Sequence, residues 1–195
     1  MKMNRVLKLF ANNRVWNFFL TKFFLPNILK LIEQEPKNAL EIGCGAGFTT
    51  KELLNRFPRM RLTAIDIDSE QVKKAKRNLN TEDKSRFQVL MADAAKLPFT
   101  PESFDTVFVF DTLHHIANFE ESIKEISRVL KNGGCLYIMD VGKEFFNPIF
   151  RWIDQPEALF TLEEIKNAAQ KFNFKIKKQL DGKKIFYLVF EKHYD

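Results

Sequence analysis

Short apolar runs alternate with amphipathic helical patterns along most of the chain. Helical spacing of apolar residues predicts helices over residues 49–57, 69–79, 119–130 and 161–172. Runs short enough to be strands lie at residues 38–42, 61–67, 87–92, 106–110, 135–141, 175–179 and 185–190. The run at 106–110, TVFVF, is typical of a strand buried on both faces of a parallel sheet. Strands that alternate with helices predict an α/β fold around a mostly parallel central sheet.

Local signals predict where several of these elements begin and end. Asp68 or Ser69 is expected to cap the helix that follows it, and the sequence TLEE at 161–164 is a capping box. The sequence NGG at 132–134 is expected to end the helix before it. An Asp-Gly pair at 181–182 predicts a hairpin turn between the last two strands.

The first 35 residues follow a different pattern. Residues 15–25, VWNFFLTKFFL, are strongly apolar but are interrupted by three polar residues. A membrane-spanning helix needs about 20 apolar residues, so this stretch is too short and too polar to span a bilayer. We predict one or two amphipathic helices within residues 1–35, the second opened by Pro26, which cap the site of a single domain over residues 36–195.

Length and cysteine content narrow the classes of protein that remain. A chain of 195 residues supplies about one domain. Two cysteines, Cys44 and Cys135, are too few for a disulfide framework or a four-thiolate zinc site, and no secretion signal is visible. We therefore expect a cytoplasmic protein without a metal site, in which both cysteines serve packing.

The net charge of +6 admits an anionic partner. The basic residues are spread along the chain and do not form the dense block typical of a nucleic-acid-binding arm, which argues against a nucleic-acid partner. Contact of the N-terminal segment with an anionic membrane surface stays open, with its aromatic rings in the interface and Arg14, Lys22 and Lys30 at the headgroups.

A glycine-rich turn, GCGAG at 43–47, follows the first predicted strand. Such a turn between a strand and a helix brings backbone N–H groups close to a ligand, and Asp66 ends the next strand where a carboxylate can accept from ribose hydroxyls. A dinucleotide site would need glycine at Phe48, which excludes a dehydrogenase. Glu41 would repel pyrophosphate but would attract an ammonium group. These features favour a ligand with ribose, adenine and an amino acid but no phosphate.

The sequence LEIGCGAG at 40–47 resembles the first motif of class I S-adenosylmethionine-dependent methyltransferases of the small-molecule type, also described as methyltransferase domain 11. The resemblance covers about residues 36–192, with every motif in order. The further motifs are AIDID at 64–68, MADAAKLPF at 91–99, FDTVFVFDTLHHI at 104–116 and LKNGGCLYIMDV at 130–141. It implies a Rossmann-like, seven-stranded, mostly parallel sheet with an antiparallel last strand and helices on both faces. It also implies S-adenosylmethionine as cofactor and S-adenosylhomocysteine as product.

The resemblance implies a set of cofactor-binding residues at the ends of the first four strands. These are Glu41, Gly43, Cys44, Gly45, Gly47, Asp66, Ile67, Asp93, Ala94, Phe110 and Asp111. Glu41 and the glycine turn would border the methionine end, and Asp66 would bind the ribose hydroxyls. Ile67 would pack on the adenine, with Asp93 at its amino group. Phe110 and Asp111 would lie near the transferable methyl.

His114 and His115 are the candidates for a general base, because an imidazole titrates near neutral pH. Adjacent residues of a helix or turn do not share a face, so we expect at most one ring to point into the site. Methyl transfer needs mainly the alignment of nucleophile, methyl and sulfur in a site with little water. A structural or cofactor-lining role for both histidines therefore stays open.

Two aromatic-rich segments are expected to form the acceptor pocket. Family members build this pocket from the N-terminal segment and from the insertion after the fifth strand, which points to Trp16, Phe145, Phe150 and Trp152. The predicted function is direct, in-line methyl transfer to a small, apolar or lipid-like acceptor. The open alternatives are an RNA or protein methyltransferase, a non-catalytic cofactor-binding scaffold, and rings that only cover the sheet.

Overall fold

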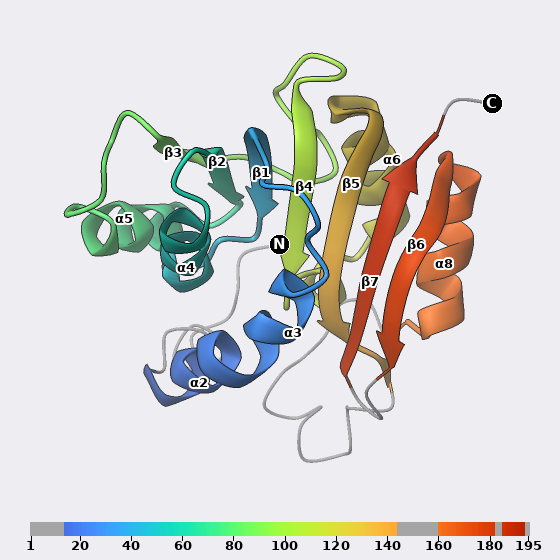
Figure 1. Ribbon diagram of the computed structural model, residues 1–195, viewed down its shortest axis with the longest axis horizontal. Helices are drawn as coiled ribbons and strands as arrows, with labels where there is room; N and C mark the ends of the chain where they lie inside the picture. Colours follow the sequence, from blue (N-terminus) through green and yellow to red (C-terminus); the bar gives the residue numbers. More distant parts are fainter. Residues whose placement is uncertain (1–13, 144–159, 182–184, 194–195) are drawn as a thin grey trace.

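The seven predicted runs form one sheet in the computed structural model, which describes residues 14–143, 160–181 and 185–193. The strand order is β3-β2-β1-β4-β5-β7-β6 (Figure 1). The strands are β1 Asn38–Ile42, β2 Arg61–Asp66, β3 Phe87–Met91, β4 Phe104–Phe110, β5 Leu130–Val141, β6 Phe174–Asp181 and β7 Ile185–Lys192. The first five strands pair in parallel, and β7 runs antiparallel to both β5 and β6. The expected sheet with a reversed last strand is confirmed.

Helices cover both faces of this sheet, as expected (Figure 1). One core contains buried residues of α6 and α8, and the other contains buried residues of α3, α4 and α5. The helices are α2 Arg14–Phe19, α3 Leu25–Leu29, α4 Phe48–Arg56, α5 Ser69–Asn78, α6 Phe119–Val129 and α8 Leu162–Lys171. A π-helical stretch, η1 Leu20–Phe24, joins α2 to α3, and a short 3-10 helix, η2 Leu113–His115, follows β4.

Side-chain alternation along the central strands builds the two cores. On β4, Val107 and Val109 point into the core under α6 and α8, whereas Phe108 and Phe110 point into the core under α3 to α5. Successive residues of a strand face opposite sides, so a strand buried on both faces must be apolar throughout. Because β1 to β5 run parallel, their carboxyl ends lie along one edge of this double-sided core.

The predicted helix signals act as expected, with one difference at β5. The Asp68 side chain caps α5 by accepting the backbone N–H of Glu70 at 2.8 Å, and the capping box at 161–164 starts α8. However, β5 begins at Leu130, which pairs with Phe104, and the NGG turn forms an irregularity inside the strand. Gly133, with φ of 72°, makes this bulge sterically accessible.

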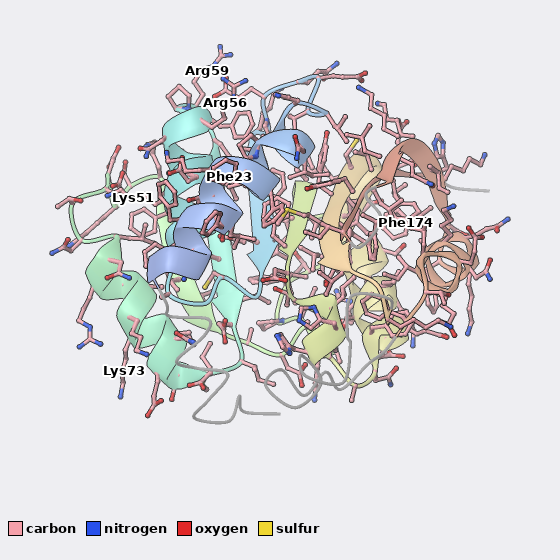
Figure 2. All side chains as sticks on the ribbon, turned by 90° about the horizontal axis from the view of Figure 1, so that it is seen from below. Phe23, Lys51, Arg56, Arg59, Lys73 and Phe174 are labelled. Carbon is pink, nitrogen blue, oxygen red and sulfur yellow. The ribbon has the colours of Figure 1, made fainter. Side chains whose placement is uncertain are left out.

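The described part of the N-terminal segment packs on the sheet through α3, where Asn27 Nδ2 donates to the hydroxyl of Tyr187 at 3.3 Å. Its outer side carries Phe18, Phe19 and Phe23, all exposed; Figure 2 labels Phe23. Within the described residues, no helix is long and apolar enough to cross a membrane. That the segment caps the site stays a prediction. The side chain of Trp16, and Phe145, Phe150 and Trp152, lie outside the described residues.

Candidate functional site

The glycine turn after β1 adopts a backbone conformation that favours glycine. Gly43, Gly45 and Gly47 have φ values of 75°, 52° and 83°. A Cβ on Gly43 would lie 2.3 Å from the side chain of Thr112, whereas one on Gly45 would meet no atom within 4 Å. Gly43 therefore allows close packing of two loops, and Gly45 presents open backbone to a ligand.

Gly43→Ala is expected to destabilise the protein more than Gly133→Ala does. Both glycines have positive φ, but a Cβ on Gly133 meets nothing within 4 Å, so that variant reports backbone strain alone, about 1 kcal/mol. The clash with Thr112 should add about 1–3 kcal/mol at Gly43. Urea unfolding of both variants measures the difference, and equal loss of stability in both would contradict the close packing.

Asp66 ties the glycine turn to the end of β2. Its Oδ2 accepts the backbone N–H of Gly45 at 2.9 Å, and its Oδ1 accepts that of Asp68 at 2.8 Å. Burial raises the pKa of Asp66 above its usual range. The carboxylate predicted to bind ribose therefore also fixes the position of Gly45.

Glu41 lies behind the glycine turn, only 1% exposed. The hydroxyls of Thr49 and Thr50, in the first turn of α4, donate to its two carboxylate oxygens. Burial raises the pKa of Glu41 to about 7, although both hydroxyls act to lower it. Any attraction of Glu41 for an ammonium group would therefore act from beneath the glycine turn. It would strengthen as the carboxyl ionises near pH 7.

Cys44 lies in the glycine turn, between Gly43 and Gly45. It does not have the properties of a nucleophile. It is 3% exposed, and burial raises the pKa of its thiol, so the thiolate is disfavoured. Its side chain belongs to the core beneath α4 and α5.

The two predicted adenine contacts, Ile67 and Asp93, are exposed just after β2 and β3. Ile67 keeps 39% of its surface exposed although it is apolar. Asp93 is exposed and accepts the backbone N–H of Ala95 at 2.9 Å, while Ala94 beside it is buried. An apolar side chain and a carboxylate on adjacent strands offer a flat base a packing surface and a hydrogen-bond acceptor.

The end of β4 turns sharply after Phe110. Phe110 is 4% exposed and packs against Phe108, with 5.5 Å between ring centroids. Asp111 is partly exposed and has φ of 52°, which is uncommon for a residue other than glycine. Thr112 Oγ1 donates to the carbonyls of Phe110 at 2.8 Å and Gly43 at 3.4 Å. Asp111 is thus brought to the same edge of the sheet as the glycine turn.

The two histidine rings lie against each other, with 3.9 Å between centroids. Both residues belong to η2, a single tight turn, and the expectation that at most one ring points into the site stays a prediction. His114 is 2% exposed and His115 is partly exposed. His114 Nδ1 lies 2.6 Å from Oδ1 of Asp140, a contact that the sequence patterns did not predict.

Gln71 is a second residue that the sequence patterns did not point to. It is fully buried on the inner side of α5, one turn before Ala75, which packs against Gly47. Neither polar atom of its side chain has a hydrogen-bond partner among the described residues. An unpaired buried amide costs about 1–3 kcal/mol, so a ligand with hydroxyl groups beside the glycine turn would relieve that cost. The sequence signal that could have identified Gln71 is a polar residue on the inner side of the predicted helix.

These features fit S-adenosylmethionine. The open backbone of Gly45, the carboxylate of Asp66 and the exposed Ile67 lie around the carboxyl ends of β1 and β2. Gln71, with its unpaired amide, lies in the first turn of α5, which follows β2. Ligands of open α/β sheets bind at this end of the strands. The combination offers hydrogen-bonding groups for ribose and an apolar surface for adenine.

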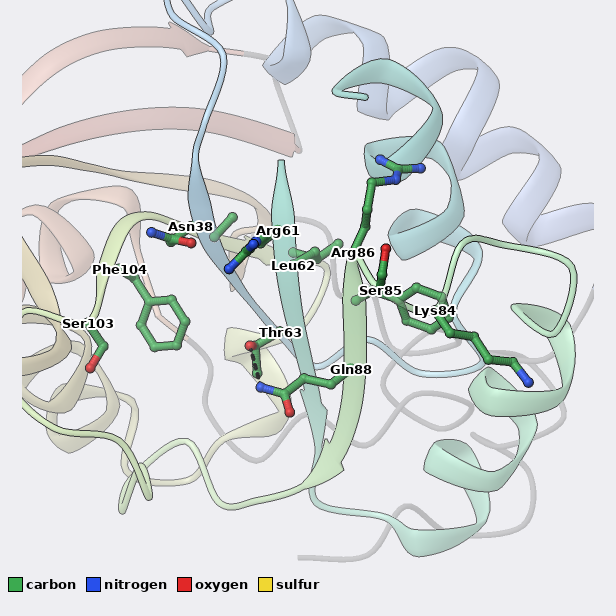
Figure 3. A pocket seen from close by; sticks show the side chains of 12 residues that line it. Asn38, Arg61, Leu62, Thr63, Lys84, Ser85, Arg86, Gln88, Ser103 and Phe104 are labelled. Carbon is green, nitrogen blue, oxygen red and sulfur yellow. Dashed lines mark hydrogen bonds between the residues drawn. The ribbon is translucent and has the colours of Figure 1, made fainter. Parts of the chain in front are cut away.

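A groove of about 460 Å³ lies at the opposite end of the sheet (Figure 3). It is lined by the amino ends of β1 to β4, and Gln88 Nε2 donates to Thr63 Oγ1 at 3.0 Å within it. Residues 92–103, all described, form no helix that would cover this part of the sheet. Its polar lining is typical of a solvated sheet face, and it contains none of the predicted site residues.

Comparison with known proteins shows the family and the fold of the chain. A family profile described as a methyltransferase domain matches residues 40–138, just over half of the chain. A demethylmenaquinone methyltransferase from Leptospira interrogans is 31% identical over 156 residues, which cover 77% of this chain and 62% of the relative. A malonyl-(acyl-carrier protein) O-methyltransferase from Legionella pneumophila is 27% identical over 121 residues, which cover 62% of this chain and 42% of the relative.

The chain thus spans only 42% to 62% of the length of these two curated relatives. Among solved structures, phosphoethanolamine N-methyltransferase 2 of Haemonchus contortus, in complex with phosphomonomethylethanolamine and S-adenosylhomocysteine, superposes with a TM-score of 0.80 at 18% identity. The superposition covers 100% of this chain and 61% of that one, and at this identity the likeness concerns the fold. The family profile, the ordered motifs and the sheet show that the chain belongs to the class I S-adenosylmethionine-dependent methyltransferases.

Proposed function

We propose that this protein transfers the methyl group of S-adenosylmethionine to a small, apolar or lipid-like acceptor by direct in-line displacement. One observation carries the proposal: Asp66 and the turn after β4 both bond to the glycine turn, so the residues predicted to bind the cofactor share one sheet edge with Asp111 and two imidazoles. The name of one relative supports an apolar acceptor, since that protein is a demethylmenaquinone methyltransferase.

In this proposal the cofactor supplies an electrophilic methyl on a positively charged sulfur when it is bound. Asp66, Ile67, Asp93 and the glycine turn orient the ribose, the adenine and the amino-acid end. Asp111 and the histidine pair border the transfer position, where an imidazole can take the proton of a hydroxyl or amine nucleophile. The predicted aromatic segments would exclude water from the acceptor.

The test uses methyl-labelled S-adenosylmethionine, the purified protein and an extract of the source cells. Label in the organic-soluble fraction that requires the protein is expected and would identify the acceptor as apolar. Label only in the aqueous or macromolecular fractions would overturn the apolar acceptor but keep the methyltransferase. Cofactor binding without any label in the three fractions would favour a cofactor-binding scaffold.

We also propose that the protein works in the cytoplasm and touches the membrane surface through the N-terminal segment. Cys44 and Cys135 are unpaired thiols, as in a reducing compartment. Phe18, Phe19 and Phe23 are 54%, 46% and 56% exposed, and their rings pack on one another with centroids 5.5 to 6.3 Å apart. Exposed aromatic rings beside cationic residues suit the interface of an anionic bilayer.

Replacing both Phe19 and Phe23 by serine is expected to weaken binding to vesicles of anionic phospholipid by about tenfold, because the apolar contact with the acyl region is lost. Sedimentation with vesicles at low salt measures the change. Ile176→Ser and Leu180→Ser, at exposed apolar positions of β6, provide the control that should leave binding unchanged. Failure of the unmodified protein to sediment would remove the membrane contact.

A further inference from the structure

Asp140, near the carboxyl end of β5, is a fully buried carboxylate that accepts four hydrogen bonds. Its Oδ1 accepts from His114 Nδ1 at 2.6 Å and from the backbone N–H of Val141 at 2.8 Å. Its Oδ2 accepts from the backbone N–H groups of Thr112 at 3.2 Å and Leu113 at 2.7 Å. Three of the four donors belong to the turn that follows Asp111.

Asp111, His114 and Asp140 form a cluster with the residue types of a metal site, but the carboxylate oxygens of Asp140 are already used by hydrogen bonds. Asp111, His114 and Asp140 each place a potential ligand atom within 4.8 Å of the others. A carboxylate has about four lone-pair positions, and Asp140 uses four for N–H donors. Binding a cation there would break the bonds that hold the turn, so the cluster is suited to a proton and not to a metal ion.

The ionisation of Asp140 fixes where that proton lies. Burial acts to raise the pKa of Asp140, but the charge and hydrogen bond of His114, with the N–H groups of Val141 and Leu113, lower it below its usual range. An ionised carboxylate only accepts hydrogen bonds, so Nδ1 of His114 must be the donor. The ring of His114 is thereby held in one orientation, with the ring of His115 against it.

The same bonds hold an unusual backbone conformation in place. Asp111 has φ of 52°, and such a residue persists where its surroundings determine it strongly. Met139 accepts the N–H of Asp111 at 2.7 Å, and Asp140 accepts the next two N–H groups. Thr112 in turn packs on Gly43. β5 thus positions both the end of β4 and Gly43, the first glycine of the glycine turn.

We propose that Asp140 is a positioning residue for methyl transfer: through its bonds to 112–114 it holds Asp111 and the two imidazoles at the transfer position. This inference rests on the proposed function, because the turn matters to catalysis only if the end of β4 borders the methyl group. The titratable groups that face His114 among the described residues are Asp140 from β5, Asp111 at the end of β4 and His115 from η2.

The histidine content of the chain makes this directly measurable. It has three histidines, so ¹⁵N-histidine NMR spectra of the full chain can be assigned with His115→Asn and His193→Asn. In Asp140→Asn, the titration midpoint of His114 is expected to fall by about one pH unit or more, because the partner charge is lost. Affinity for S-adenosylhomocysteine, used as the probe, is expected to fall about tenfold. His193→Asn, at the far end of β7, should change neither.

An unchanged His114 midpoint in Asp140→Asn would overturn the proposal, because a purely structural loss does not move that titration selectively. If Asp140→Asn does not fold, His114→Asn preserves a donor to Asp140 and removes the titrating ring. The Asp140 midpoint, followed by ¹³C NMR, should then rise by about one unit, and no rise would overturn the proposal. If the unmodified protein fails to bind S-adenosylhomocysteine, the proposed function fails, whereas the titration still decides the Asp140–His114 pair.

Discussion

Asp66→Ala is expected to weaken the binding of S-adenosylmethionine by about 100-fold. A good hydrogen-bonded pair between a carboxylate and the ribose hydroxyls contributes about 1.5–3 kcal/mol, which corresponds to roughly 10- to 150-fold in affinity. The variant also leaves the N–H groups of Gly45 and Asp68 without their acceptor, so the turn that presents the ligand loses its link to β2. Isothermal titration calorimetry measures the change directly.

Asp83→Ala is the matched control for this prediction. Asp83 is exposed and, among the described residues, its side chain bonds to Ser85 and Arg86 near the amino end of β3, so cofactor affinity should not change. A loss of less than about threefold in Asp66→Ala would show that ribose does not meet this carboxylate.

Glu41→Gln is expected to make the protein more stable above pH 7 and to weaken its hold on the cofactor. Glu41 has a usual pKa of 4.5 that burial raises to about 7 in the folded state. A carboxyl whose folded pKa is raised lowers the free energy of unfolding as pH rises from 4.5 to 7, and this loss persists above pH 7. A shift of this size corresponds to roughly 3 kcal/mol, so removing the charge should raise the melting temperature by several degrees at pH 8.5.

Thermal unfolding at pH 4 and pH 8.5 tests this prediction, because the stability gain should vanish at the lower pH. The glutamine amide can still pair with the hydroxyls of Thr49 and Thr50, so the variant changes charge more than packing. Cofactor affinity at pH 8.5 should fall, since an ammonium group loses a nearby negative charge. A melting temperature at pH 8.5 below that of the unmodified protein would contradict the assigned cost of burying Glu41.

Much of the candidate site follows from the place of each residue at or just after the end of a strand. The glycine turn lies directly after β1, Asp66 ends β2 and Asp111 follows β4. The ends of parallel strands share one edge of a sheet, so the order of motifs is enough to bring these residues together. Residues such as Asp68, whose capping bond reaches two positions along the chain, are predictable for the same local reason.

The sequence by itself determined the α/β fold, the caps of α5 and α8, and the strand ends at which the candidate site residues lie. These features depend on hydrophobic periodicity, on capping and turn residues, and on the order of elements along the chain, all of which can be read from the sequence. Only the tertiary structure decided that Asp140 pairs with His114, that the two histidine rings lie in contact, and that Glu41 and Gln71 are buried. Those facts depend on register and burial, which bring together residues as far apart as 26 positions and change the energy of each charge.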